Sequence, residues 1–317
     1  MNSSASATPS IERLVSLLDS MVEGDRAVEQ LIALGQSSVP YLERFLLNSP
    51  PRSLSLPRCR AVRALGELGA YSSLMAYFQR YTRPADAAVL FAEDGVRSAA
   101  AEQLLHCQNE DVFPVLLDAA RERATGGLVR ALGEFRRPEA IPAFFELLED
   151  DLCREDAKEA LRKNAASARS YALLLLRGRT ELPITGPAAS RRRRATLQLM
   201  AEWGMSAAEW PELRGFLWDE DMDCVVAAAG VGLRLSESNK EEIVAALIEN
   251  SGGMNWAQET DAAELLDACG ETARTVAMRI AEHRRNLGEK PDWTSPFWRT
   301  LHHLLGGGPH ARFGGAA

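Results

Sequence analysis

Apolar residues recur along this chain at the three- and four-residue spacing of an amphipathic helix. The clearest stretch is Leu128–Leu148, which reads LVRALGEFRRPEAIPAFFELL. Leu128, Leu132 and Phe135 share one face of a first helix, and a short polar turn follows. Pro142 then stands near the start of a second helix, where its missing N–H would be unpaired in any case. This stretch predicts two antiparallel helices joined by a tight turn.

The first-helix pattern occurs eight times along the chain, including the copy just described. When Phe135 is taken as the anchor, the residue three before it is usually leucine and the residue seven before it is small or apolar. The anchors of the eight copies are Leu34, Leu68, Cys107, Phe135, Asn164, Trp203, Leu235 and Cys269. Prolines mark the corner before four of the second helices: Pro40, Pro114, Pro142 and Pro211. We therefore predict an all-α superhelix, a solenoid of about eight antiparallel helix pairs between Asp25 and His283, each packed on its neighbours.

Two stretches resemble a known family. Residues 94–104 (DGVRSAAAEQL) resemble the HEAT-repeat consensus, and residues 131–148 resemble the bacterial subtype that is also found in phycobiliprotein lyases. Asp94 and Arg97 match the turn aspartate and first-helix arginine of the family, and so do Asp151 and Arg154. The resemblance covers roughly residues 25–283. It implies a right-handed superhelix whose second helices line the concave side, with these four residues forming a structural ladder between repeats.

The spacing of the anchors is uneven. Leu68 to Cys107 and Asn164 to Trp203 are 39 residues each, whereas Cys107 to Phe135 is 28. Proline, glycine and serine predict that the extra residues form loops at 81–93 and 177–190, with a smaller loop at 48–57. All three join a second helix to the next first helix, an edge where insertions often mark the binding face of a solenoid. Tolerated variation of surface loops is the alternative.

The two ends of the repeat are predicted to be covered. Ile11–Val22 reads as a capping helix with Ser10 as its N-cap, and Pro296–Leu305 reads as a last short helix. Trp293, Phe297 and Trp298 would fill the open end beneath that last helix. The whole is predicted as one solenoid domain over residues 11–305, between a disordered N-terminus at 1–10 and a flexible tail at 306–317.

Composition narrows the classes of partner. The formal net charge is −8, which disfavours a protein that grips nucleic acid through phosphates, although a local basic patch stays open. No apolar stretch is long enough to span a bilayer, and the N-terminus carries no export signal. Five widely separated cysteines form neither a disulfide framework nor a Cys-x-x-Cys metal motif. A cytoplasmic protein with no membrane partner is expected.

Arginines form the strongest charge feature. Arg191, Arg192, Arg193 and Arg194 are consecutive, and Arg177 and Arg179 lie shortly before them. Guanidinium groups bind carboxylates or phosphates in a bidentate manner, so the cluster is a candidate site for an anion, a nucleic acid or an acidic peptide. The alternative is a solvated helix start whose arginines pair with the acidic turns 149–151 and 219–223. Four arginines at a helix N-terminus oppose its macrodipole, which makes a purely structural role less natural.

Other reactive residue types suggest structure rather than chemistry. The acidic turns lack the glycine and alternation of a calcium loop and are expected to cap first helices. None of the five histidines is followed by glutamate, so the His-Glu pairs of deoxyhypusine hydroxylase, a di-iron HEAT enzyme, are absent. The cysteines at repeat positions read as small core residues. Trp203 and Trp210 read as core, whereas Trp218 and Trp256 are freer to contact a partner. We expect no catalytic residues, no metal and no cofactor.

Three functions remain open at this stage. The first is a non-catalytic scaffold that binds a protein or acidic peptide through the concave face or the insertion-loop edge. The second is a nucleic-acid-binding or DNA-repair protein that uses the arginines of residues 177–194. The third, which rests on the family resemblance alone, is a lyase-like protein that handles a tetrapyrrole.

Overall fold

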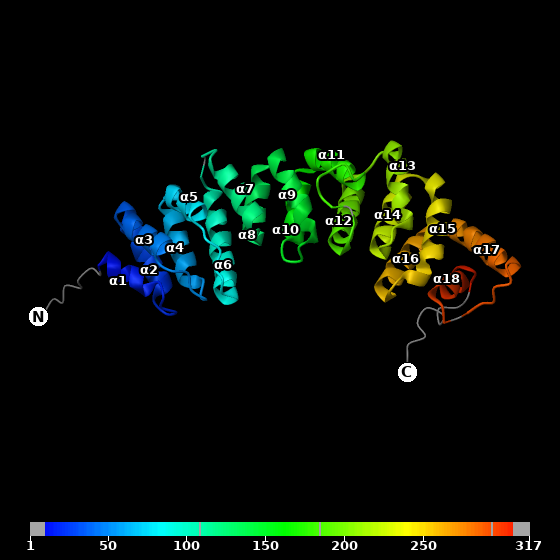
Figure 1. The fold of residues 1–317 in the computed structure, drawn as a ribbon, viewed down its shortest axis with the longest axis horizontal. Coiled ribbons are helices and arrows are strands. Elements are labelled where there is room, and N and C mark those ends of the chain that lie inside the picture. Colours follow the sequence, from blue (N-terminus) through cyan, green and yellow to red (C-terminus); the bar gives the residue numbers. More distant parts are fainter. Residues whose placement is uncertain (1–9, 108, 184, 293, 307–317) are drawn as a thin grey trace, which may run out of the picture. The chain divides into compact units, whose positions relative to one another are not determined.

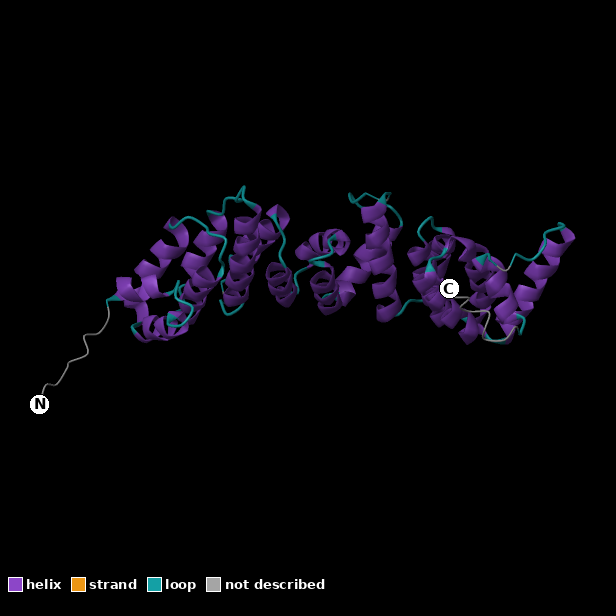
Figure 2. Cartoon of the chain, turned by 90° about the horizontal axis from the view of Figure 1, so that it is seen from below, coloured by secondary structure: helices purple, strands orange, loops and turns teal. Residues whose placement is uncertain are grey.

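The computed structural model describes residues 10–107, 109–183, 185–292 and 294–306. Within these ranges the chain consists of helices and loops, with no strand (Figure 1 and Figure 2), so the all-α class is confirmed. The chain divides into two compact units, an N-terminal unit (Met1–Ala168) and a C-terminal unit (Arg169–Ala317). The tails 1–9 and 307–317 and Trp293 lie outside the described residues. The prediction of one solenoid domain over 11–305 stays a prediction.

The N-terminal unit is built of neighbouring helix pairs. Its first helices are α2 (Gly24–Ala33), α4 (Leu56–Glu67), α6 (Ala87–Leu104), α8 (Gly126–Phe135) and α10 (Arg154–Lys163). Its second helices are α3 (Val39–Asn48), α5 (Tyr71–Gln79), α7 (Val112–Glu122) and α9 (Ile141–Glu146), and α1 (Ile11–Leu17) precedes them. Each first helix packs on the next one, from α2 through α10, while α1, α3, α5 and α7 pack in a second row (Figure 1). Ser10 is the N-cap of α1, as predicted.

The C-terminal unit repeats this arrangement. Its first helices are α12 (Pro187–Trp203), α14 (Met222–Leu235) and α16 (Trp256–Cys269). Its second helices are α13 (Trp210–Leu213), continued by the 3-10 helix η5 (Arg214–Trp218), then α15 (Lys240–Asn250) and α17 (Glu271–Asn286). Helix α11 (Ala165–Leu176) spans the boundary between the units. The predicted last helix is α18 (Pro296–Leu304), which packs on α15, α16 and α17 with Phe297 and Trp298 against the core.

The repeating stripe forms the core of both units. The residues seven before the anchors are all buried: Ala27, Ala61, Ala100, Leu128, Ala157, Thr196, Ala228 and Ala262. The residues three before the anchors are buried as well: Leu31, Leu65, Leu104, Leu132, Leu161, Met200, Gly232 and Leu266. A small residue at the first of these positions lets neighbouring first helices approach closely. The amphipathic period in the sequence therefore identified the buried face of every first helix.

The anchors coincide with the ends of the first helices. Seven of the eight anchors are the last residue or C-cap of a first helix, and only Cys107 lies beyond its helix, which ends at Leu104. After four of them the next residue is a glycine with positive φ, as is common at helix C-termini: Gly35 (68°), Gly69 (69°), Gly204 (71°) and Gly270 (54°). Arg136 also has a positive φ (51°) after Phe135, without the freedom of glycine.

The second helices begin where the prolines predicted. Helices α3, α9 and α13 each carry proline as their second residue, at Pro40, Pro142 and Pro211. Pro114 is the third residue of α7, because this helix starts one residue earlier, at Val112. All four prolines therefore lie in a first turn, where no intrahelical N–H bond is lost.

Two of the predicted loops are shorter than expected. Helix α6 begins at Ala87, with the Asp86 side chain accepting hydrogen bonds from the backbone N–H groups of residues 88 and 89 at 2.9 Å. Half of the 81–93 insertion therefore extends the first helix instead of forming a loop. Helix α12 likewise begins at Pro187, inside the 177–190 insertion. A strong N-cap and an N-terminal proline extend these helices beyond the minimal repeat.

The four family-matching residues make contacts of two kinds. Asp94 lies inside α6 rather than in a turn, and it pairs with Arg123 at the end of α7, in the same helix pair. Arg97 donates hydrogen bonds to the carbonyl oxygens of Ala119 and Arg123, at 2.7 and 3.0 Å. Asp151 and Arg154 pair within a single turn. Arg154 also donates to the carbonyl oxygens of Leu148 and Glu149, at 2.8 and 3.4 Å, and so joins α10 to the end of the preceding helix pair. The ion pair of Asp94 and the hydrogen bonds of Arg97, in contrast, lie within one helix pair.

Other ion pairs connect successive first helices. Their members lie 26 to 35 residues apart, about one repeat. They are Arg60–Asp25, Arg130–Asp156, Lys163–Glu134 and Arg194–Asp223. Most of their side chains are partly exposed, so each pair contributes little to stability alone and mainly fixes the relative position of neighbouring helices.

A buried polar cluster lies among α4, α5 and α6. Glu93 is 2% exposed, and its carboxylate pairs with Arg58 (Nε to Oε1, 2.9 Å) and accepts a hydrogen bond from the Tyr77 hydroxyl at 2.9 Å. Arg58 also donates to the Ser49 carbonyl oxygen at 3.0 Å. Burial and the neighbouring Glu93 charge raise the pKa of Tyr77 far above its usual value, so Tyr77 remains a hydrogen-bond donor. The sequence analysis did not single out these three residues.

Candidate functional site

A broad groove in the C-terminal unit brings most of the predicted binding residues together. The end of α11, the loop after it, and the first turns of α12 and α14 form its walls, with η5 between them. Arg177, Arg191, Arg192, Arg193 and Trp218 all line it. Residues from two segments about 25 positions apart therefore meet in one surface feature, although the sequence analysis proposed them separately.

Carboxylates oppose several of the groove arginines. Arg193 donates to Asp219 Oδ1 at 2.9 Å and to Ser190 Oγ at 3.2 Å. Burial, the largest single influence, lowers the pKa of Arg193, but the hydrogen bond to Asp219, the charge of Asp219 and the neighbouring Cys224 together outweigh it, so the pKa of Arg193 is raised. Arg177 pairs with Glu212 on α13. These contacts join the two walls of the groove.

The remaining arginines have different surroundings. Arg192 is 2% exposed, and its Nη1 donates to the carbonyl oxygen of Pro183 at 2.9 Å, which ties the loop to α12. Arg194 pairs with Asp223 on α14 and does not line the groove. Arg179 is exposed on the loop and also lies outside the lining. The consecutive arginines therefore have different surroundings, because neighbouring side chains on a helix point in different directions.

Acidic residues balance the charge of the groove. Its four arginines face four carboxylates from Glu212, Asp219, Glu220 and Asp221, so the formal sum over these groups is 4 − 4 = 0. These carboxylates offset the unfavourable interaction between the four consecutive arginines near the start of α12 and the positive end of the α12 macrodipole. The groove is therefore polar and of mixed charge rather than strongly basic.

The acidic turn before α14 has a clear structural role. Asp221 is the N-cap of α14 and accepts a hydrogen bond from the Asp223 N–H at 2.9 Å, while Asp219 accepts one from the Asp221 N–H at 2.9 Å. Asp150 accepts from the Leu152 and Cys153 N–H groups at 2.7 and 3.2 Å, but the N-cap residue of α10 is Cys153, whose side chain makes no capping hydrogen bond. The predicted capping role is therefore confirmed for Asp221 before α14, whereas the turn before α10 uses its aspartate to stabilise the turn itself. Among the described residues, no three His, Cys, Asp or Glu side chains gather as a metal site.

Apolar side chains complete the groove. Trp218 is 56% exposed at the end of η5, and Leu176, Phe216 and Met222 line the same groove. These last three could not be recognised as groove residues from the sequence, because an isolated apolar residue in a helix cannot be distinguished from a core residue without the tertiary fold. Only the position of Trp218, outside the repeat stripe, was a usable signal.

Buried cysteines are expected to be poorly reactive. Burial and, to a smaller extent, nearby aspartates together raise the pKa of Cys153 to about 11 and that of Cys224 to about 12. Near pH 8 we expect iodoacetamide to alkylate Cys153 on the order of 100-fold more slowly in the folded protein than in denaturant, because only the thiolate reacts. Mass spectrometry of cysteine peptides measures both rates. Equal rates in the two conditions would contradict this prediction.

Comparisons with known proteins identify no family for this chain. No protein-family profile matches the chain, and a comparison with curated proteins likewise finds no relative. In the part of the chain that the structure describes, no helix is both long and apolar enough to cross a bilayer. The groove must therefore be interpreted from its own chemistry.

Proposed function

We propose that this chain is a non-catalytic interaction scaffold of the HEAT-type solenoid class, and that the groove of the C-terminal unit binds an extended segment of a partner protein. The observation that carries this proposal is the exposed Trp218 indole in a groove of balanced charge. Tryptophan is enriched among the residues that dominate protein–protein affinity, since it contributes a large apolar area and one hydrogen-bond donor.

The mixed charge of the groove favours a polypeptide partner. An extended peptide presents its own N–H and C=O groups together with side chains of either charge, and such a ligand matches alternating arginines and carboxylates. Trp218, Phe216 and Met222 would receive its apolar side chains, while Arg191 and Arg177 would meet its carboxylates. This refines the predicted acidic peptide to an amphipathic one.

Exposed apolar side chains also support an interaction role. Leu54 and Leu152 are exposed in segments that join a second helix to the next first helix, Met21 and Val22 in the segment between α1 and α2, and Trp218 at the end of η5. Phe91, on the N-terminal extension of α6, is 77% exposed. Of these residues, Trp218 lines the groove together with Phe216 and Met222, and apolar side chains gathered in one groove are typical of a protein-binding surface.

Nucleic-acid binding is the alternative that the groove supports less well. Binding to phosphates needs a surplus of positive charge, because affinity comes from counterion release. Here Arg177 and Arg193 are already paired with carboxylates, and Arg192 is buried. A phosphate backbone would have to displace these acidic side chains or leave them unneutralised beside it.

The proposal is tested by comparing Trp218→Ala with Phe91→Ala in co-purification from extract of the native cell, followed by affinity measurement with the captured polypeptide. We expect Trp218→Ala to weaken binding by about 30-fold, as expected for a central interface tryptophan. Phe91→Ala removes an exposed aromatic residue from the other unit and should leave the affinity at the groove unchanged.

Two outcomes would overturn the proposal. One is retention of the partner by Trp218→Ala with full affinity. The other is binding of labelled duplex or single-stranded DNA with a steep salt dependence that the alanine variants of Arg191 and Arg193 abolish, which would establish the nucleic-acid function instead.

A further inference from the structure

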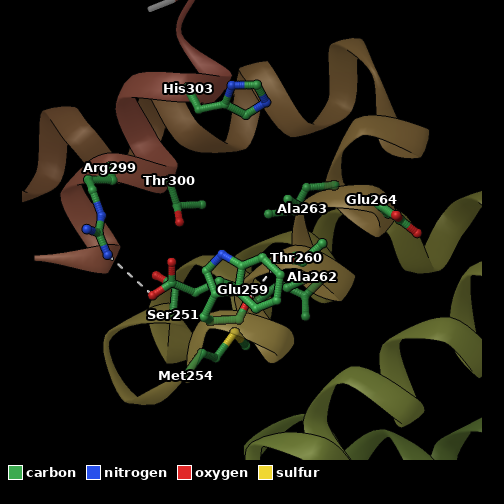
Figure 3. Close-up of a pocket in the computed structure, with 13 residues that line it drawn as sticks. Ser251, Met254, Glu259, Thr260, Ala262, Ala263, Glu264, Arg299, Thr300 and His303 are labelled. Atoms are coloured by element: carbon green, nitrogen blue, oxygen red, sulfur yellow. Dashed lines mark hydrogen bonds and ion pairs between the residues drawn. The ribbon is translucent and has the colours of Figure 1, made fainter. Parts of the chain in front are cut away.

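A second, smaller cavity lies near the C-terminal end of the same unit (Figure 3). It is enclosed by α16, α18 and the 3-10 helix η7 (Ser251–Gly253), and its volume is about 120 Å³. A cavity of roughly this size accommodates a single aromatic ring. None of its lining residues lines the groove, so it is a separate feature.

One part of the cavity wall is apolar. Leu247, Met254, Ala262 and Leu266 are buried there and belong to the core of the unit. Trp256, the first residue of α16, is 67% exposed and also lines the cavity. A thioether and an indole together provide favourable contacts for a flat apolar group.

The polar part of the wall is rich in hydrogen-bond acceptors. The Ser251 hydroxyl donates its proton to the Ile248 carbonyl oxygen at 2.6 Å, and the Thr260 hydroxyl donates to the Trp256 carbonyl oxygen at 2.9 Å. A hydroxyl has one proton, so each of these oxygens has only acceptor capacity left for a ligand. The carboxylate of Glu259, 25% exposed, adds two more acceptor atoms.

Two donors on the wall, Arg299 and His303, are engaged with carboxylates, and the indole N–H of Trp256 is a further donor of the lining. Arg299 of α18 faces Glu259 across the cavity and pairs with it at 3.4 Å (Figure 3). His303 Nε2 lies 3.1 Å from Asp267 Oδ1. With histidine neutral, the charged lining groups Glu259, Glu264 and Arg299 sum to 1 − 2 = −1. Helix α16 carries four acidic residues and no Lys, Arg or His, which adds to the negative field: Glu259, Asp261, Glu264 and Asp267.

We propose that this cavity binds a small organic cation, an ammonium group on an apolar stem. The apolar stem would pack between Trp256 and Met254, and the ammonium group would donate to Glu259 and to the hydroxyl oxygens of Ser251 and Thr260. An ammonium has three donors and no acceptor, which complements the acceptor oxygens of Ser251, Glu259 and Thr260 on this wall. The indole face adds cation–π attraction.

The test is a calorimetric titration of the whole protein with three probes of matched size and different charge. Benzylammonium should bind about tenfold more tightly than neutral benzyl alcohol, because charge-assisted hydrogen bonds are stronger than neutral ones. Benzoate should bind most weakly of the three. Nα-acetyl-lysine amide, added as a fourth probe, distinguishes a lysine side chain of a polypeptide from a free amine, depending on which of the two ammonium compounds binds more tightly.

Variants locate the binding. Trp256→Ala and Glu259→Gln should each weaken benzylammonium binding by about tenfold, since one removes the aromatic wall and the other the negative charge. Trp218→Ala, which alters the separate groove, is the matched control and should bind as the unaltered protein does. Both Trp256 and Trp218 are more than half exposed, so these variants should remain folded.

Three results would overturn the proposal. Tightest binding by benzoate would show that Arg299 governs the cavity, and equal binding of the three benzyl probes would show a purely apolar void. Absence of binding by both ammonium compounds would exclude the site. Because the Trp218 control tests the groove independently, failure here is distinguishable from failure of the proposed scaffold function.

Discussion

Replacing Glu93 by alanine is expected to destabilise the helices α4, α5 and α6 by about 3–5 kcal/mol, the cost of leaving a buried charge without its partner. The variant leaves the Arg58 guanidinium, 8% exposed in its side chain, without a counter-charge. It also leaves the Tyr77 hydroxyl without its acceptor. Hydrogen exchange is the appropriate measurement, because it reports the local opening of these three helices separately from the rest of the chain.

Two controls separate the buried charge from other effects. Glu67→Ala removes the partner of Arg63 in a pair that is about half exposed, and it should change stability by no more than about 0.5 kcal/mol. The double variant Glu93→Leu with Arg58→Met replaces both charges by apolar groups and should recover most of the lost protection. If Glu93→Ala were no more disruptive than Glu67→Ala, the buried pair would have no special role.

Gly127→Ala is expected to destabilise the packing of α6 against α8 by about 1–3 kcal/mol, the usual cost of overpacking. A Cβ atom on Gly127 would lie 2.6 Å from the Cα of Ser98 and 2.8 Å from its carbonyl oxygen. These are backbone atoms, so the contact can be relieved only by moving one helix away from the other. Thermal unfolding followed by circular dichroism measures the loss.

The same substitution at Gly230 provides the matched control. A Cβ atom there would meet nothing within 4 Å, and Gly230 lies in the interior of α14. Gly230→Ala should therefore stabilise the protein by about 1 kcal/mol, the difference in helix propensity. Opposite signs for the two variants are the expected result. A stabilising Gly127→Ala would show that the two first helices are not in close contact at this point.

The arginine cluster shows how much of the candidate site could be predicted from the sequence. The sequence identified Arg191–Arg194 and Trp218 as separate candidates and left a structural role for the arginines open. In the folded unit, one turn of α12 points Arg192 into the interior and Arg193 toward Asp219. Identical neighbouring residues thus acquire different surroundings, because successive side chains on a helix point about 100° apart. A run of like residues could not predict that separation.

The cavity beside α16 could not be predicted from the sequence. Its wall combines Ser251, Trp256 and Arg299, which come from three elements and share no spacing pattern. The repeat continues through this region, and only the docking of α18 encloses the space. A cavity that forms only when a distant helix packs over it leaves no recognisable pattern in the local sequence.

The sequence by itself determined the all-α class, the eight buried stripes and the places where first helices end and second helices begin. These features follow from local periodicity, from proline in first turns and from the small residues that close packing requires. Tertiary structure alone decided which charges are paired or buried, as for Glu93 with Arg58, and which apolar residues remain exposed, as for Trp218. Those outcomes depend on residues about one repeat apart in the chain, whose contacts arise only when neighbouring helices pack.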